Sequence, residues 1–188
     1  MGKLIALINT TPDGFVGSEF VIADAEFHEY VHGLLANTQT VAFGRNTFEL
    51  FQGVWPPILE GGSPHASQVK MARKLNDIDK TVFSSTLAAT KWNNSIIVKS
   101  MDAEAINNFK QTSSMNMLTI GSPGLVAALT KLGLVDEYHF SIQPVIAGNE
   151  GGVRLFDKIS MAARQPLQFV GATQLKSGVV IISYQKAG

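Results

Sequence analysis

Apolar residues recur with two different periods along this chain of 188 residues. Short apolar runs bounded by turn residues predict buried strands, and apolar positions spaced three and four apart predict helices. We expect strands at 4–8, 40–43, 81–83, 95–98, from 117 onward, 138–146, 167–175 and 179–184. We expect helices at 24–35, 46–51, 66–75, 103–110 and 125–132, with Asp24 as N-cap of the first and an irregular Gly/Pro-rich loop at 53–64.

The predicted strands and helices alternate along the chain. Alternation of this kind predicts an α/β fold of three αβα layers, in which helices cover both faces of a mostly parallel sheet. The last two strands flank Lys176-Ser-Gly178, which predicts a C-terminal antiparallel hairpin. No repeat or linker interrupts the pattern, so one domain over residues 1–188 is expected.

Two stretches combine a buried strand, a glycine and the start of a helix. They are Thr40-Val-Ala-Phe-Gly-Arg-Asn-Thr-Phe-Glu49 and Met117-Leu-Thr-Ile-Gly-Ser-Pro-Gly-Leu-Val126. A helix N-terminus has free N–H groups and a positive dipole end, so it attracts phosphate. The candidate contacts are Gly44, Arg45, Asn46 and Thr47 in the first turn, and Gly121, Ser122, Gly124 and Leu125 in the second. A dinucleotide held at two points is one interpretation; the other is that such turns need glycine simply to fold.

Composition narrows the classes of partner. The 15 basic and 15 acidic residues balance, which gives no general attraction for nucleic acid or an anionic membrane. The chain has no cysteine, which excludes disulfides and thiolate metal sites. The apolar run at 4–8 stops at Asn9, too early for a secretory signal, so a cytoplasmic location is expected.

One segment matches a metal-binding pattern. His28-Glu29-Tyr30-Val31-His32 has the spacing of a zinc peptidase, with two histidines one helical turn apart and a glutamate between them. Leu35 stands where the glycine of the longer signature would be. An ordinary helix face is therefore favoured and no metal is expected, while a zinc peptidase stays a distant alternative.

Several motifs occur in an order that resembles a known family. They are Leu4-Ile-Ala-Leu-Ile-Asn-Thr-Thr-Pro-Asp-Gly-Phe-Val-Gly17, Phe43-Gly-Arg-Asn-Thr-Phe48, Val82-Phe-Ser-Ser-Thr-Leu87, Val98-Lys-Ser-Met-Asp-Ala-Glu-Ala-Ile106, Ile120-Gly-Ser-Pro-Gly-Leu125, the segment 133–148 and Arg154-Leu-Phe156. This order resembles the dihydrofolate reductase fold, and specifically its bacterial branch related to the C-terminal reductase domain of riboflavin biosynthesis. The resemblance covers nearly the whole chain.

The resemblance implies NADPH as cofactor. The residues that would surround its 2′-phosphate are Arg45, Ser84, Ser85 and Lys99, which supply forked donors, hydroxyls and a point charge. Backbone N–H groups of Gly121, Ser122 and Gly124 would hold the pyrophosphate, although Pro123 removes one donor. Asn9, Val16 and Gly17 would line the nicotinamide and its covering loop.

The substrate side departs from dihydrofolate reductase. Counting back from Gly44 without gaps, His28 occupies the place of that enzyme's carboxylate, and Asp24 or Glu26 would replace it only if the loops differ in length. Ser141 matches a hydroxyl that supports the carboxylate in the family. His28 is the expected proton donor.

The activity implied by the resemblance is reduction of a heterocyclic small molecule by NADPH. The substrate would be a pyrimidine or pterin, most like that of 5-amino-6-(5-phosphoribosylamino)uracil reductase. The alternatives are dihydrofolate reductase proper and a non-catalytic NADP-binding protein. A homodimer is also expected, since relatives of the riboflavin branch commonly form two-fold dimers.

Overall fold

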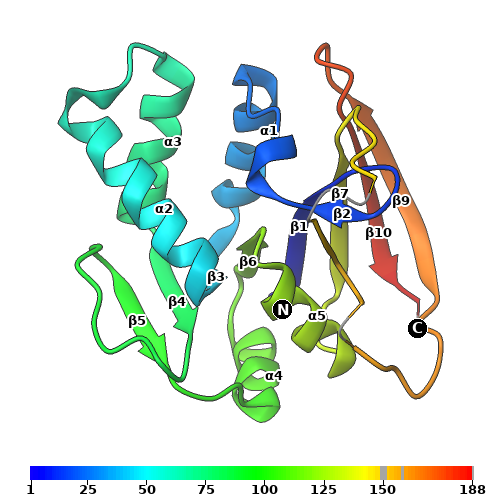
Figure 1. Cartoon of the computed structure of the whole chain (residues 1–188). Helices are drawn as coiled ribbons and strands as arrows, with labels where there is room; N and C mark the ends of the chain where they lie inside the picture. Colours follow the sequence, from blue (N-terminus) through cyan, green and yellow to red (C-terminus); the bar gives the residue numbers. More distant parts are fainter. Residues whose placement is uncertain (149–151, 158, 188) are drawn as a thin grey trace. The chain divides into compact units, whose positions relative to one another are not determined.

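The structure is a computed structural model that describes residues 1–148, 152–157 and 159–187. The chain forms two compact units (Figure 1). The first comprises Met1–Gly2 and Ala23–Leu118, and the second comprises Lys3–Ile22 and Thr119–Gly188. Strand β6 (Asn116–Ile120) continues from the first unit into the second. The single domain expected over 1–188 stays a prediction.

Three parallel strands lie wholly within the first unit, in the order β5-β4-β3, and the first residues of β6 continue the order beside β3. They are β3 (Thr38–Gly44), β4 (Asp79–Phe83) and β5 (Ser95–Val98). Gly44 is the register partner of Phe83, and Phe83 is the partner of Val98. The carboxyl ends of all three strands are therefore aligned.

Four α-helices belong to this unit: α1 (Ala25–Ala36), α2 (Arg45–Pro57), α3 (Ala66–Asp77) and α4 (Ala103–Thr112). The N-cap prediction for α1 is confirmed, because the Asp24 carboxylate accepts a hydrogen bond from the Phe27 N–H at 2.8 Å. Helix α2 packs against α3, which lies beside it in Figure 1. The aromatic core of the unit includes Phe43, Phe48 and Trp92, all buried.

The irregular loop predicted at 53–64 is wrong. Helix α2 continues to Pro57, and a π-helical turn, η2, follows at Ile58–Gly62. Along α2, the ring of Trp55 packs against the rings of Phe51 and of His28 in α1. The distances between ring centres are 6.1 Å and 5.9 Å. This aromatic packing keeps the segment helical, since tertiary contacts outweigh the weak local preferences of Gly and Pro. Gly61, inside η2, has a left-handed φ of 98°, and the turn ends at Gly62.

Lys80, at the amino end of β4, has no exposed surface. Its ammonium donates to three carbonyl oxygens near the end of α3: Leu75 at 2.8 Å, Ile78 at 2.7 Å and Asn76 at 3.2 Å. The ammonium also lies 4.7 Å from the centre of the Trp92 ring. Burial lowers the pKa of Lys80 to about 8. Lys80 thus closes the C-terminal end of α3 from inside the unit.

The second unit has strands in the order β1-β7-β10-β9. They are β1 (Leu4–Thr10), β7 (Glu137–Ile142), β9 (Leu167–Gln174) and β10 (Val180–Lys186). β1 and β7 are parallel, while β10 is antiparallel to both of its neighbours. The predicted C-terminal hairpin is confirmed, and β9 and β10 lie side by side in Figure 1.

Smaller elements complete the second unit. Helix α5 spans Pro123–Lys131, η1 is a 3-10 turn at Ser18–Phe20, and the short strands β2 (Phe15–Val16) and β8 (Val153–Arg154) pair antiparallel. The strand predicted at 138–146 ends earlier, at Ile142, because Pro144 has no N–H to continue a strand ladder. The expected α/β class with a mostly parallel sheet is confirmed.

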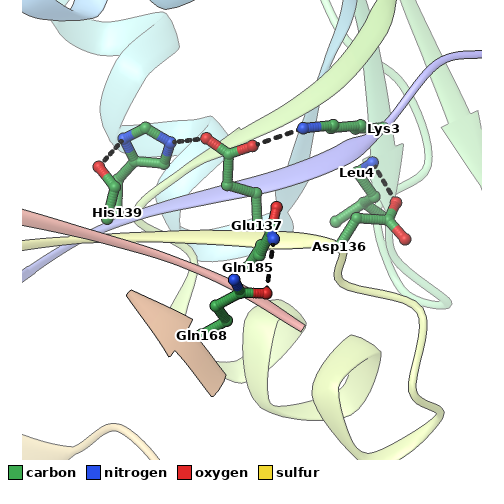
Figure 2. Close-up of polar contacts among 8 residues, drawn as sticks. Lys3, Leu4, Asp136, Glu137, His139, Gln168 and Gln185 are labelled. Carbon is green, nitrogen blue, oxygen red and sulfur yellow. Dashed lines mark hydrogen bonds and ion pairs between the residues drawn. The ribbon is translucent and has the colours of Figure 1, made fainter. Parts of the chain in front are cut away.

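Several polar and charged side chains contact one another near the amino ends of β1 and β7 (Figure 2). We call Lys3, Glu137, His139 and Ser183 the amino-end cluster. One carboxylate oxygen of Glu137 is 2.7 Å from His139 Nε2, and the other accepts from Lys3 Nζ at 3.0 Å. These bonds lower the pKa of Glu137 to about 2, and the bond to His139 makes the largest contribution.

Candidate cofactor and substrate site

A cationic cluster lies at the aligned strand ends of the first unit. It consists of Arg45, Ser84, Thr86 and Lys99. Arg45 follows β3 directly and opens α2, Ser84 follows β4, and Lys99 follows β5. Ligands of parallel sheets bind outside these carboxyl ends. Three of the four residues that the sequence assigns to the 2′-phosphate therefore stand next to one another along this edge.

Hydrogen bonds tie the cationic cluster together. Arg45 donates from Nη1 to the Thr86 hydroxyl at 3.0 Å and from Nε to the Glu49 carboxylate at 3.0 Å. The ammonium of Lys99 donates to the carbonyl oxygen of Leu87. A guanidinium has five N–H donors and an ammonium has three, so donors remain on both exposed cations. The cluster thus offers two positive charges, one at the start of α2 and one directly after β5.

The Ser84 hydroxyl orders that loop. It accepts the N–H of Leu87 at 3.0 Å and the N–H of Thr86 at 3.3 Å. Such turns are a common use of serine. Thr86, which the sequence reasoning missed as a site residue, is thereby held against Arg45. Its only signal was its position two residues after the strand-end serine. Ser85, the fourth predicted residue, is exposed in the same loop.

The first turn of α2 presents backbone donors beside the cluster. Gly44 is the N-cap, so the N–H groups of Arg45, Asn46 and Thr47 have no carbonyl partner within the helix. Asn46 is exposed and Thr47 is half-buried. The helix begins where the sequence predicted a glycine turn, one residue earlier than the expected start at Asn46.

The second glycine turn has an unusual backbone. Gly121 and Ser122 both have left-handed φ values, 69° and 56°, and Pro123 opens α5 directly after them. The Gly121 N–H donates to the Leu7 carbonyl at 2.8 Å. That donor is used inside the protein, so the expected contact of Gly121 with pyrophosphate has no free N–H. The donors that remain in the first turn of α5 are those of Gly124 and Leu125.

Three neutral side chains meet at the carboxyl ends of β1 and β7. We call Asn9, Ser141 and Gln143 the amide cluster. Asn9 and Ser141 are register partners. Nε2 of Gln143 donates to the Ser141 hydroxyl at 2.9 Å and toward Asn9 Oδ1 at 3.3 Å. Ser141 and Gln143 have no exposed surface, whereas Asn9 is half-buried. Asn9 is therefore the member of the cluster that retains exposed surface.

Gln143 is the residue that sequence reasoning missed here. Its carbonyl oxygen Oε1 accepts the N–H of Ile22 at 2.9 Å, and its own backbone N–H donates to the Thr10 carbonyl at 2.8 Å. The sequence placed Gln143 inside a longer strand, where a glutamine carries no special signal. In the structure β7 ends at Ile142, and Gln143 lies just beyond it.

Asp13, in the loop after β1, joins this loop to the loop that contains Ala147 and Gly148. The Asp13 carboxylate accepts the Thr11 hydroxyl at 2.6 Å and the N–H groups of Gly148 at 2.8 Å and Ala147 at 3.2 Å. These bonds lower the pKa of Asp13 to about 2, and the bond from Thr11 makes the largest contribution. The carboxylate thus stays ionised and keeps the two loops together across the ordinary pH range.

Val16 and Gly17, the other residues predicted near the nicotinamide, follow Asp13 in the same loop. Val16 is buried and pairs with Val153 of β8, and Gly17 is half-buried. Arg154 lies over the Phe15 ring, with its guanidinium carbon 4.8 Å from the ring centre. The short β2–β8 pair therefore fixes the segment that leads into Gly17.

His28, the expected proton donor, is buried in α1 with 5% of its surface exposed. Its Nδ1 is 3.4 Å from the Ser67 hydroxyl, and its ring meets that of Trp55 edge-on. Burial lowers the pKa of His28, with the charge of Asp24 opposing the shift. The neutral imidazole is thereby favoured. His28 belongs to the first unit and Ser141 to the second.

The alternative carboxylates and the zinc pattern lie on the same helix. Asp24 caps α1, and Glu26 is half-buried in its first turn. Glu29, the glutamate of the zinc pattern, pairs with Lys70 at 2.9 Å. Within 1–148, 152–157 and 159–187, no three His, Cys, Asp or Glu side chains come close enough to hold a metal ion. None of the helices described there has the length and apolar character of a membrane span.

Comparison with known proteins gives the family. The model of the RibD C-terminal domain matches residues 5–181, and the chain belongs to this family. It is 26% identical over 193 residues to the uncharacterized protein YyaP of Bacillus subtilis, covering 99% of this chain and 96% of that protein.

Solved structures share the fold. A putative riboflavin biosynthesis protein from Shewanella sp. PV-4 superposes with a TM-score of 0.72 at 16% identity, over 99% of both chains. Dihydrofolate reductase from Enterococcus faecalis, solved with NADP(H), superposes with a TM-score of 0.61 at 13% identity, over 100% of this chain and 98% of that one. The predicted resemblance to the dihydrofolate reductase fold and its riboflavin-related branch is confirmed.

Proposed function

We propose that this protein is an NADPH-dependent reductase of a pyrimidine- or pterin-type substrate, most like 5-amino-6-(5-phosphoribosylamino)uracil reductase. The observation that carries the proposal is the cationic cluster at the aligned ends of β3, β4 and β5. Membership of the RibD C-terminal domain family supports the reductase class. The dihydrofolate reductase neighbour, solved with NADP(H), supports a nicotinamide cofactor.

The residues fit the extra phosphate of NADPH. Arg45 supplies a planar fork of donors and Lys99 a compact charge, the two groups that bind phosphate best. The Thr86 hydroxyl is fastened to Arg45, and Ser85 is exposed in the same loop. The first turn of α2, in the same unit, would add backbone N–H donors for a further phosphate. When bound, the cofactor would supply a hydride.

Side chains of the protein would orient the nicotinamide and protonate the substrate. Asn9 would present its amide to the nicotinamide side, backed by the amide cluster, and Val16 and Gly17 would cover it. His28 would hold the proton for the substrate; its lowered pKa makes the protonated, donating form less populated as the pH rises. We therefore expect turnover to fall as the pH rises, and His28→Ala to remove most of the turnover while leaving NADPH affinity unchanged.

Cofactor preference tests the proposal. Each charge-assisted hydrogen bond to the 2′-phosphate contributes about 1.5–3 kcal/mol, so NADPH should bind roughly tenfold or more tightly than NADH. Lys99→Met should lower that preference by about the contribution of one such contact, since Arg45 remains, and should leave NADH affinity unchanged. Lys91→Met, at an exposed lysine of the same unit, is the matched control and should change neither. Calorimetry that gives equal affinities for the two cofactors would contradict the proposal.

A substrate screen separates the remaining candidates. Loss of nicotinamide absorbance with a ribosylaminopyrimidine phosphate supports the pyrimidine reductase, and loss with dihydrofolate supports dihydrofolate reductase. NADPH binding with no turnover on any pyrimidine or pterin supports a non-catalytic NADP-binding protein. Stoichiometric zinc that is lost in His28→Ala and His32→Ala would revive the peptidase alternative.

We further propose a cytoplasmic homodimer that binds neither nucleic acid nor membrane. Strand β9 supports the dimer: it exposes three apolar side chains, Leu167 at 38%, Phe169 at 60% and Val170 at 53%. Phe169→Asp should shift the sedimentation mass from two chains to one. A parent mass of one chain at micromolar concentration would contradict the dimer.

A further inference from the structure

The amide of Gln143 is buried and makes a different bond with each of its two polar atoms. Its side chain has no exposed surface. Oε1 accepts the N–H of Ile22, at the end of the loop that follows β2, at 2.9 Å. Nε2 donates to Ser141 Oγ at 2.9 Å and toward Asn9 Oδ1 at 3.3 Å. An uncharged residue that is fully buried and satisfied on both sides has a fixed orientation.

This orientation determines what Asn9 presents. Because Nε2 of Gln143 faces Asn9 Oδ1, the Asn9 amide must turn its NH₂ group away from Gln143. Asn9 is the half-buried member of the amide cluster, so that NH₂ group is the one offered to a ligand. The same glutamine holds the loop through Ile22. One side chain thus couples the position of the loop to the polarity of the ligand-facing amide.

We propose that Gln143 is a positioning residue, which fastens the Gly17–Ile22 segment with its carbonyl oxygen and orients Asn9 as a donor with its amide nitrogen. The proposal rests on the proposed function in so far as the ligand at Asn9 is NADPH. We call the fastening of the Gly17–Ile22 segment the loop half of the proposal and the orienting of Asn9 the orientation half. The loop half needs no bound ligand.

Two substitutions separate the two bonds. Gln143→Glu keeps an oxygen that accepts from Ile22 but removes the donor to Asn9, whereas Gln143→Met removes both. In Gln143→Glu the Asn9 amide would turn over and present its oxygen to the ligand. We expect hydrogen exchange of the Ile22 amide to stay at the parent rate in Gln143→Glu and to rise roughly tenfold in Gln143→Met. Gln168→Met, at an exposed glutamine of the same unit, is the matched control.

NADPH affinity reports on the orientation of Asn9. At pH 8 Gln143→Glu should bind NADPH roughly tenfold more weakly than the parent. The deficit should shrink at pH 5.5, since a protonated carboxylic acid regains a donor; Gln143→Met should show no such recovery. In Asn9→Ala, the further change Gln143→Glu should cost nothing more, because the oriented group is already gone. A merely structural glutamine would give additive losses without recovery at low pH.

The outcomes are distinguishable. Unchanged Ile22 exchange in Gln143→Met overturns the loop half, and additive losses in the Asn9 cycle overturn the orientation half. If the parent binds no NADPH, the proposed function fails, and Ile22 exchange still decides whether Gln143 holds the loop. If Gln143→Met does not fold, exchange of Gln143→Leu replaces it, and the Asn9 cycle is unaffected.

Discussion

The two ends of the strands carry polar groups of different kinds. At the amino ends, Lys80 of the first unit is fully buried and Glu137 of the second is 15% exposed, and each is bonded within the protein. At the carboxyl ends, Arg45 and Lys99 are exposed cations with donors to spare. The charges at the amino ends are bonded within their own units, whereas those at the carboxyl ends of the first unit are exposed, as the proposed cofactor site requires. Substitutions at the two ends should therefore change different measurements.

Lys80→Met should give the largest change in stability. Methionine has a similar length but no donor, so three carbonyl oxygens near the end of α3 lose their bonds to the ammonium. We expect the free energy of unfolding to fall by about 3 kcal/mol. Urea unfolding measures it, with Lys91→Met as the exposed control in the same unit. A loss of NADPH affinity in folded Lys80→Met would break the distinction between the two ends.

Glu137→Gln tests the amino end of the second unit. The substitution removes the negative charge to which His139 and Lys3 are bonded (Figure 2). We expect a loss of about 2 kcal/mol in the free energy of unfolding at pH 7, with NADPH affinity unchanged. Glu19→Gln, at an exposed glutamate of the same unit, is the control and should change stability little. Equal losses in both variants would show that Glu137 contributes nothing beyond an ordinary surface charge.

The pH dependence of this difference has a defined sign. The pKa of Glu137 lies at about 2 in the folded protein, below its ordinary value of 4.5. A lowered pKa means that the ionised group stabilises the fold above pH 4.5, and that this stabilisation is lost as the pH falls toward 2. The stability difference between the parent and Glu137→Gln should therefore shrink over that range. A difference that is constant from pH 6 to pH 3 would contradict the assignment.

The carboxyl ends were the easier part to predict from sequence. Arg45, Ser84 and Lys99 each follow a short apolar run directly, so locating the strands also located these residues. The start of α1 could also be predicted, because an N-cap residue such as Asp24 bonds to the N–H of a residue in the first turn of its own helix. Binding by these residues stays a prediction.

The residues that were missed depend on atoms distant in the sequence. Gln143 bonds Ile22, which lies 121 positions away, and no local pattern marks such a pair. The helical path of α2 beyond Gly53 depends on Trp55 packing against His28 of another helix. Lys80 stands just before the strand predicted at 81–83, where a lysine carries no special signal, and its buried ammonium bonds carbonyl oxygens near the end of α3. Sequence periodicity locates elements, but it does not reveal which buried polar atoms meet.

The smallest expected effect concerns the competition for Arg45 at the carboxyl end. Glu49 accepts from Arg45 Nε at 3.0 Å, and both side chains are nearly half exposed, at 47% and 44%. In Glu49→Gln the guanidinium keeps its bond to Thr86 but loses a negative neighbour. An exposed pair of this kind is worth about 0.3–0.5 kcal/mol, so NADPH should bind about twofold more tightly. NADH affinity should stay unchanged, and the gain should vanish at high salt, where exposed charges are screened. Glu60→Gln, an exposed acid of the same unit, should change neither affinity. If Glu49→Gln weakens NADPH binding instead, the carboxylate holds Arg45 in its binding geometry rather than competing with the phosphate.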